Sequence, residues 1–539
     1  MLRPMIRCSI LKRLLICTPL ISVFLVGCGK GGFSERNAAG KVGIFHDAMA
    51  AAPTTFDPGK VEDVPTSEVI LNVFEGLVAY GDKNTIEGRI AESYSSPDNG
   101  KTWIFKLRHG VKFQNGREVT ADDFSWSLDR NCSKELGSPT ARNYLSDIVG
   151  VEDRLNGKTE HISGVRVVDP YTLSIELDQP RPYFIGKMTY PCAFALCKEA
   201  VGTGSIDKPD QAIGSGPFKL DSYIPQQQVN LVPNKLYYGT VPTITRIERP
   251  IIKDASTRLL KYKAGDLDIL TLDRKDIEGI QADQKLKSQL VFETRPAIYY
   301  LGINQQNFPP LKDQRVRRAI AMAINRGRLT KDLLGGLHEA KGLIAPGVMG
   351  YRENYAGLPY NPAGAKAALA EAGYPDGKGF PPIELEYREG AGDAQICCEA
   401  ILEDLKKNLG ITVNIRTMEW GAMLHARNEN KLQMYFLSWY ADYLDPQNFL
   451  SFLLCSDAKL NHDGYKNDKF DELCKRADSL LDEKQRLDLY QQAEDVAVLD
   501  VARVPLYFQR DAILINPRVT GRRSNLFGAL PDTTVKVGG

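Results

Sequence analysis

The sequence MYFLSWYADYLDPQNFL, residues 434–450, begins as an apolar and aromatic run of the kind that forms a buried strand. The run turns polar at Asp442, and Asp445-Pro446 signals a turn or the start of a helix. In α/β sheets ligands gather beyond the carboxyl ends of strands, where an acid among aromatic side chains can receive a cation. The aromatic neighbours are Trp439, Tyr440 and Tyr443. The alternative is that Asp442 caps a turn and these aromatic residues belong to the core.

The length and composition of the chain set its broad class. Its 539 residues are too many for one ordinary core and correspond to about three or four domain-sized units. The composition, 43% apolar and 25% charged, is that of a soluble globular protein. The formal net charge of +1 and the scattered Lys and Arg residues give no support to a nucleic-acid partner.

The N-terminus carries a targeting signal. A positive region that contains Arg3, Arg7 and Lys12 precedes an apolar stretch, residues 14–26, that is short for a transmembrane helix. Leu25-Val26-Gly27-Cys28 resembles the bacterial lipobox, which implies cleavage after residue 27 and a lipid on Cys28. The alternatives are an uncleaved anchor or an ordinary signal peptide. Residues 28–40 are glycine-rich at their start and predict a flexible tether outside the cytoplasm, on a membrane face.

Export changes the interpretation of the cysteines. Seven remain after Cys28, so at least one of them is unpaired within the chain. Cys455 and Cys474 flank a polar loop and are the expected disulfide. No CxxC motif or clustered ligand set occurs, so we expect no metal and no cofactor.

Hydrophobic periodicity predicts alternating strands and helices, which favours α/β lobes. The amphipathic segment 315–325 has one apolar stripe opposite its arginines, and Thr120 with Asp123 forms a capping box. Ser67 is the expected cap of an early helix. The expected strands are 42–45, 102–108, 267–270, 383–387, 411–415 and 504–508, and a further helix is expected over 395–409.

The chain resembles the family 5 extracellular solute-binding proteins, the substrate-capturing components of bacterial peptide ABC importers. The resemblance covers nearly all of the mature chain. It rests on FDP at 56–58, NVFEGL at 72–77, AESY at 91–94, WIFKLR at 103–108, VTADDF at 119–124, GSGPF at 214–218, RVRRAIAMAIN at 315–325, AGYP at 372–375, GITV at 410–413 and the stretch around Asp442.

The resemblance implies a two-lobed periplasmic-binding-protein fold of type II with a hinge and an extra subdomain on the first lobe. The expected first lobe comprises 41–80, 205–295 and 505–539, the extra subdomain 81–204, and the second lobe 296–504. The implied function is that of a lipoprotein that binds oligopeptides between its lobes and delivers them to the transmembrane subunits of an ABC permease. We expect a monomer.

The resemblance also implies roles for individual residues. Asp442 matches the acid that receives the peptide ammonium group, with Trp439, Tyr440 and Tyr443 as walls that exclude water and strengthen the ion pair. Glu62-Asp63-Val64 matches a short strand segment that pairs with the peptide backbone. Arg427 matches one basic position for the peptide carboxyl end, or is a solvated surface charge. Phe436 stands where a relative has arginine, which leaves ligand length open.

The sequence contains no known enzyme motif with the residue spacing that the motif requires. No nucleophile elbow, phosphate loop or HExxH motif is present, and the pair Asp442 and Asp445 does not by itself indicate a hydrolase. We therefore expect no enzyme. Two alternatives stay open: the same fold binding a nickel chelate, haem or oligosaccharide, and a surface enzyme or adhesion lipoprotein on this scaffold.

Overall fold

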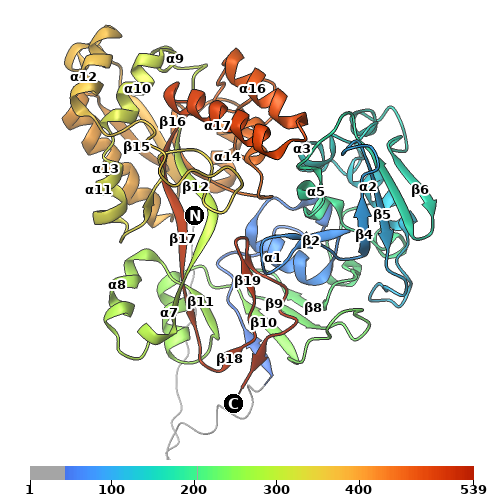
Figure 1. Cartoon of the computed structure of the whole chain (residues 1–539). Helices are drawn as coiled ribbons and strands as arrows, with labels where there is room; N and C mark the ends of the chain where they lie inside the picture. The colour runs from blue at the N-terminus through green and yellow to red at the C-terminus, as the bar shows by residue number, and fades with distance from the viewer. Residues whose placement is uncertain (1–42, 203, 539) are drawn as a thin grey trace, which may run out of the picture. The chain divides into compact units, whose positions relative to one another are not determined.

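A computed structural model describes residues 43–202 and 204–538 (Figure 1). The predicted signal peptide 1–27, the lipidated Cys28 and the tether 28–40 lie outside the described residues. Within the described ranges, no helix combines the length and the hydropathy that a membrane crossing requires.

The largest sheet has the strand order β11-β17-β12-β16-β14-β15, with β13 on the side of β17. Its two longest strands, β12 and β17, pair in antiparallel fashion and lie side by side in Figure 1. Strands β14 and β15 are parallel to each other, and β14 is parallel to β16. The bounds are β11 Ile269–Thr271, β12 Leu290–Ile303, β13 His338–Glu339, β14 Ile383–Arg388, β15 Val413–Met418, β16 Met434–Tyr440 and β17 Arg503–Ile515.

Helices from the second half of the chain cover this sheet, and the largest hydrophobic core lies between them and the strands. In α10 the buried residues Val316, Ala319, Ile320 and Ala323 form the stripe that the sequence predicts. The bounds are α9 Pro309–Lys312, α10 Gln314–Ala323, α11 Arg326–Arg328, α12 Pro362–Glu371, α13 Gly392–Leu409, α14 Trp420–Asn428, α15 Ser451–Leu454, α16 Asp468–Ser479 and α17 Glu483–Leu499.

Two four-stranded sheets have cores of their own. One has the order β1-β10-β9-β8 and packs on α1, and the other has the order β4-β5-β7-β6 and packs on α2. Their bounds are β1 Ile44–His46, α1 Val64–Val73, β4 Ala91–Ser95, β5 Thr102–Leu107, α2 Ala121–Asn131, β6 Val165–Asp169, β7 Thr172–Glu176, β8 Phe218–Ile224, β9 Gln228–Pro233 and β10 Arg246–Pro250.

Shorter elements complete the described chain. Helices α7 Ala255–Lys263 and α8 Arg274–Ala282 share a small core with β11 and β17. Helices α3 to α6 are short: α3 Ala141–Leu145 and α4 Val151–Leu155 lie between α2 and β6, and α5 Phe184–Lys187 and α6 Lys198–Val201 follow β7. The remaining strands are β2 Val78–Tyr80, β3 Ile86–Gly88, β18 Val519–Thr520, β19 Ser524–Asn525, β20 Gly528–Ala529 and β21 Lys536–Val537.

Each expected strand overlaps an observed one, but several bounds differ: β15 begins at Val413 and not at 411, and β17 runs to Ile515 and not to 508. Other errors are at helix starts. The capping box of Thr120 and Asp123 is present. Helix α1 begins at Val64 and is capped by Asp63, so the prediction of Ser67 as its cap is wrong. Asp63 takes this position because its carboxylate accepts the Thr66 N–H, which no earlier helical carbonyl can satisfy. Helix α13 starts three residues before the predicted residue 395.

Candidate functional site

Strand β16 has one edge that is paired only over its first two residues. Its whole length pairs with β12, but β14 pairs with it only at Met434 and Tyr435. The Ala441 N–H donates to the Pro296 carbonyl on the β12 side. In an antiparallel pair the backbone groups of successive residues point to opposite edges, so the even-numbered residues of β16 direct theirs away from β12. The N–H and C=O groups of Phe436, Ser438 and Tyr440 therefore face a sheet edge on which an extended chain can add a strand.

Asp442 lies two residues beyond this edge and has only neutral partners. Its carboxylate accepts hydrogen bonds from the Tyr144 hydroxyl and from the Asn448 amide, the latter at 3.4 Å. No ion pair joins it to any basic side chain in the described part of the chain. Burial raises the pKa of Asp442 to about 6, and the two hydrogen bonds offset part of that rise. The carboxylate is thus desolvated and lacks a cation.

Asn448 holds Asp442 and Trp439 in a fixed relation. Its side-chain oxygen accepts the Asp442 backbone N–H at 3.1 Å and the Trp439 Nε1–H at 2.9 Å. Asn448 is fully buried, in a short 3₁₀ turn, Pro446–Asn448, that Asp445 caps. The acid and the indole therefore occupy one rigid unit at the end of β16.

Two tyrosines from a distant part of the chain close over the acid. Tyr144 and Tyr190 stack with ring centroids 3.7 Å apart and an interplanar angle of 8°. The Tyr190 hydroxyl donates to the Val61 carbonyl at 3.0 Å. The Phe452 ring lies 5.7 Å from that of Tyr144 and 5.9 Å from that of Trp439. The walls of the site thus come from three separate segments of the chain.

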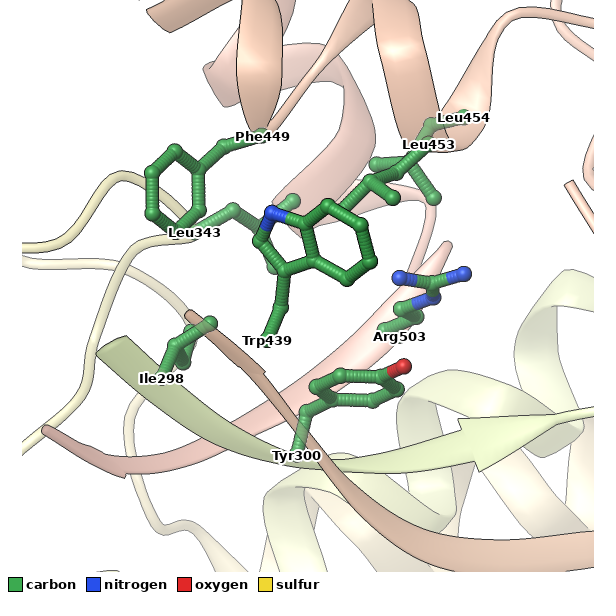
Figure 2. Close-up of a pocket in the computed structure, with 8 residues that line it drawn as sticks. All are labelled: Ile298, Tyr300, Leu343, Trp439, Phe449, Leu453, Leu454 and Arg503. Atoms are coloured by element: carbon green, nitrogen blue, oxygen red, sulfur yellow. The ribbon is translucent and has the colours of Figure 1, made fainter. Parts of the chain in front are cut away.

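Trp439 and Tyr440 point to opposite faces of the sheet. Figure 2 shows the Trp439 indole beside a small apolar cavity of about 10 Å³, which has room for roughly one water molecule. Tyr440 lies on the other face and exposes 37% of its surface. The cavity is lined by Ile298, Tyr300, Leu343, Trp439, Phe449, Leu453, Leu454 and Arg503.

The ring of Tyr443 lies 6.3 Å from that of Phe452, and its role as a wall of the site stays a prediction. Tyr443 is fully buried in the core of the second four-stranded sheet, where its side chain contacts Gly186 and its hydroxyl bonds Gln447. The next residue, Leu444, contacts a distant part of the chain, because its N–H donates to the Tyr80 hydroxyl at 2.9 Å.

The segment Glu62-Asp63-Val64 has no strand partner in the described chain, and its pairing with a peptide backbone stays a prediction. The Asp63 carboxylate accepts from the Thr66 N–H and hydroxyl, both at 2.9 Å, and from the Thr54 hydroxyl at 2.7 Å. Val64 is the first residue of α1, and its side chain is 58% exposed. Glu62 is exposed and extended before the helix. The segment adjoins the site through the Tyr190–Val61 hydrogen bond, and β16 adds a second backbone edge near Asp442.

Arg427 is half-buried near the end of α14. Its guanidinium donates to the side-chain oxygen of the neighbouring Asn428 at 3.1 and 3.3 Å and forms no ion pair with a carboxylate of the described chain. Burial, and then the charge of Arg427, lowers the pKa of His462 to about 4. The guanidinium also lies close enough to Tyr300 and Tyr435 to influence their pKa values. It is therefore an uncompensated cation beside the first residues of β16.

Cys455 and Cys474 are neighbours but are free thiols in the structure. A hydrogen bond to Cys474, followed by burial, raises the pKa of the Cys455 thiol. Their disulfide therefore stays a prediction. A search of residues 43–202 and 204–538 finds no group of three or more His, Cys, Asp or Glu side chains that could hold a metal ion.

The chain matches known proteins over almost all of its length. The sequence-family model described as bacterial extracellular solute-binding proteins, family 5 Middle, matches residues 85–461 of this chain. The chain belongs to this family. It is 30% identical over 490 residues to a probable deoxycholate-binding periplasmic protein, YgiS, of Escherichia coli, with 89% of this chain and 90% of the relative covered. It is also 30% identical over 485 residues to the periplasmic oligopeptide-binding protein OppA of Salmonella typhimurium, with 87% of each chain covered.

The solved structures of family members share the fold. The murein tripeptide-binding protein MppA of Escherichia coli superimposes with a TM-score of 0.81 at 28% identity, covering 92% of this chain and 98% of that one. The family and the α/β, two-lobed type II fold that the sequence predicts are therefore confirmed. Family members are solute-binding proteins, and the relatives above are named as periplasmic.

Sequence reasoning missed four side chains of this site. Tyr144 and Tyr190 are hundreds of residues from Asp442, and no local pattern marks them. Tyr80 is equally remote. Asn448 lies within the stretch quoted at the outset, and its position six residues after Asp442, in the turn that Asp445-Pro446 signals, was the available clue.

Proposed function

We propose that this protein is the substrate-binding lipoprotein of an ABC importer and that it captures peptides by their amino termini at Asp442. The observation that carries the proposal is the desolvated Asp442 carboxylate, which has two neutral hydrogen-bond donors and no cation. The oligopeptide-binding and murein tripeptide-binding relatives give it independent support.

A peptide ammonium group supplies what Asp442 lacks. Moving a carboxylate out of water is costly unless a cation meets it, and the same holds for the ammonium group. Removing the paired carboxylate and ammonium groups from water together costs less free energy than removing either group alone. The ion pair therefore favours a closed site. The Tyr440 carbonyl on the open edge of β16 is a further acceptor for the ammonium protons.

The peptide backbone would lie along the open edge of β16. Main-chain hydrogen bonds to Phe436, Ser438 and Tyr440 do not depend on ligand side chains, so broad specificity follows. Tyr435 and Asp442 are seven residues apart, roughly 23 Å along an extended strand. Arg427, beside Tyr435, would then receive the carboxyl end of a peptide of about five to seven residues.

The remaining parts of the proposal concern the whole protein. Each of the three larger sheets corresponds to one expected part of the chain. The sheet β1-β10-β9-β8 lies in 41–80 with 205–295, the sheet β4-β5-β7-β6 lies in 81–204, and the largest sheet lies in 296–504 apart from its strands β11, β12 and β17. Strands β12 and β17 cross residues 295–296 and 504–505, whereas β11 lies within 205–295 and pairs with β17. We propose that β12 and β17 form the hinge. The protein would act as a monomer, held by lipid on Cys28 at the extracytoplasmic face of a membrane, without cofactor or catalysis, and would deliver its ligand to a permease.

A bile-acid ligand is the second candidate, because a relative at 30% identity is named as a probable deoxycholate-binding protein. Deoxycholate presents a carboxylate and no amine. Asp442 would repel that carboxylate, whereas Arg427 would attract it. Ligand charge therefore separates the two candidates.

Calorimetry on the full chain, purified in detergent, tests the proposal. Tetra-alanine with a free amine should bind, and N-acetyl-tetra-alanine should bind at least about a hundredfold more weakly, since a buried carboxylate loses its partner. Asp442→Asn should remove the difference, and Asp457→Asn, at an exposed acid, should keep it. Equal binding of the two peptides, or binding of deoxycholate alone, would contradict the amine anchor.

A further inference from the structure

A hairpin near the C-terminus contacts several segments that are far apart in the sequence. It consists of β19 and β20, and we refer to residues 524–529 as the C-terminal hairpin. The Ser524 hydroxyl donates to the Glu293 carboxylate of β12 at 2.9 Å. The Arg295 guanidinium of the same strand donates to the Asn525 carbonyl at 3.3 Å. The base of the hairpin is therefore anchored on a strand that we propose as part of the hinge.

One side of the C-terminal hairpin packs on β2 and on the turn that follows it. The Leu526 N–H donates to the side-chain oxygen of Asn84, in that turn, at 2.8 Å. The centroid of the Phe527 ring lies 4.6 Å from that of Tyr80, the last residue of β2. The hairpin and Tyr80 are thus held together by a hydrogen bond beside them and by a ring contact.

The tip of the C-terminal hairpin reaches the expected second lobe, 296–504, at Gly347. Leu526 is half-buried and packs against the core of the largest sheet. A Cβ atom at Gly347 would overlap a methyl group of Leu526, so a glycine at this position leaves room for the leucine. Gly347 also has a φ of +85°, which residues with side chains rarely adopt. Leu526 therefore packs over a position that has no side chain.

Tyr80 makes a second contact with the expected second lobe, beside the peptide site. Its hydroxyl accepts the Leu444 N–H at 2.9 Å, and Leu444 is two residues after Asp442. The Tyr80 side chain packs against the core of the largest sheet and against the core of the sheet β4-β5-β7-β6. The C-terminal hairpin and Tyr80 together therefore contact the second lobe at two points, Gly347 and Leu444.

We propose that the C-terminal hairpin is a latch that holds the closed form of the protein, through Leu526 on Gly347 and through Tyr80 on Leu444. These contacts stabilise the closed form whether or not a peptide is bound. The apparent dissociation constant of a ligand that requires the closed form rises as the closed fraction falls. Loss of the latch should therefore weaken all ligands by the same factor. This effect on binding rests on the proposed function, whereas the contacts between the lobes do not.

Hydrogen exchange of the unliganded full chain in detergent, followed by mass spectrometry, tests the latch. Leu526→Ala removes the knob and Gly347→Ala displaces it, so both should raise the exchange rate of the fragment that contains Leu444 about tenfold, through more frequent local opening. Two matched controls should leave that rate unchanged. Leu260→Ala changes a leucine of α7 that is 66% exposed, and Gly336→Ala changes a glycine with a φ of +86° and open space around its Cβ position.

Calorimetry extends the test to binding. Both latch variants should bind tetra-alanine and tetra-lysine about tenfold more weakly than the wild type does, with the same factor for each peptide. An unchanged exchange rate at Leu444 in both variants would refute the latch, and so would unequal losses for the two peptides. An equal rise in exchange at the amides of β14 would also refute it, because the variants would then loosen the second lobe itself. If the wild type binds neither peptide, the proposed function fails, and the exchange rates still decide the latch.

Discussion

Replacing Asp442 by Asn should make the unliganded protein more stable at neutral pH. Burial raises the pKa of this carboxyl from 3.8 to about 6, so the folded state favours the neutral acid. At a pH above both values the ionised carboxylate costs the folded state about 1.4 kcal/mol per pKa unit, which gives about 3 kcal/mol as an upper value. Asn has the same shape and no charge, and it relieves this cost.

The sign of the effect depends on pH. Because the folded pKa is raised, the wild-type protein has its full stability below about pH 4 and loses stability as the pH rises toward 6. The Asn variant has no such loss. The two proteins should therefore differ by about 1 kcal/mol at pH 4.5 and by up to about 3 kcal/mol at pH 7.5.

Urea unfolding of the unliganded full chain at both pH values measures this difference, with Asp457→Asn as the control at an exposed acid. The same Asn variant should fail to distinguish free-amine from acetylated peptides. A variant that is less stable than the wild type at pH 7.5 would refute the reasoning. So would a stability difference that stays constant between pH 4.5 and 7.5, because the cost would then not arise from ionisation of Asp442.

Three further predictions concern binding and localisation. Affinity for free-amine peptides should fall about tenfold per pH unit below about pH 6, where Asp442 is protonated. It should also fall above about pH 8, where the peptide amine loses its proton. An affinity that is constant from pH 4.5 to 7 would contradict this prediction. Tyr144→Phe removes a hydrogen bond that lowers the pKa of Asp442, so the acid limit of binding should move to higher pH, and an unchanged limit would exclude the contact. Cys28→Ser should release the protein from membranes in a fractionation assay, and continued membrane attachment would argue against the lipid anchor.

The sequence predicts those parts of the fold that depend on local patterns. The strand at 434–440, the capping box at Thr120 and the stripe of α10 follow from periodicity and capping, and all three are present. The start of α1 was misplaced because Ser67 and Asp63 both have capping side chains. Tertiary contacts decided between them, since Asp63 also bonds Thr54.

The site was predictable only where it is local. Asp442 and Trp439 lie in one stretch, and the structure places both beside the open strand edge. Tyr443 is in the same stretch, but its ring is buried against Gly186 and Phe452, and no pattern near residue 443 indicates these contacts. The stacked pair Tyr144 and Tyr190 depends on packing between segments that are far apart in sequence, which periodicity does not encode.

The pKa of Asp442 itself tests the central claim most directly. A carboxyl-labelled aspartate can be followed by carbon NMR as the pH is changed, with Asp442→Asn used to assign its signal. We expect an Asp442 pKa near 6 in the unliganded protein, a lower pKa when a free-amine peptide is bound, and no fall with the acetylated peptide. An Asp442 pKa that does not respond to the peptide amine would contradict the claim that this carboxylate receives it.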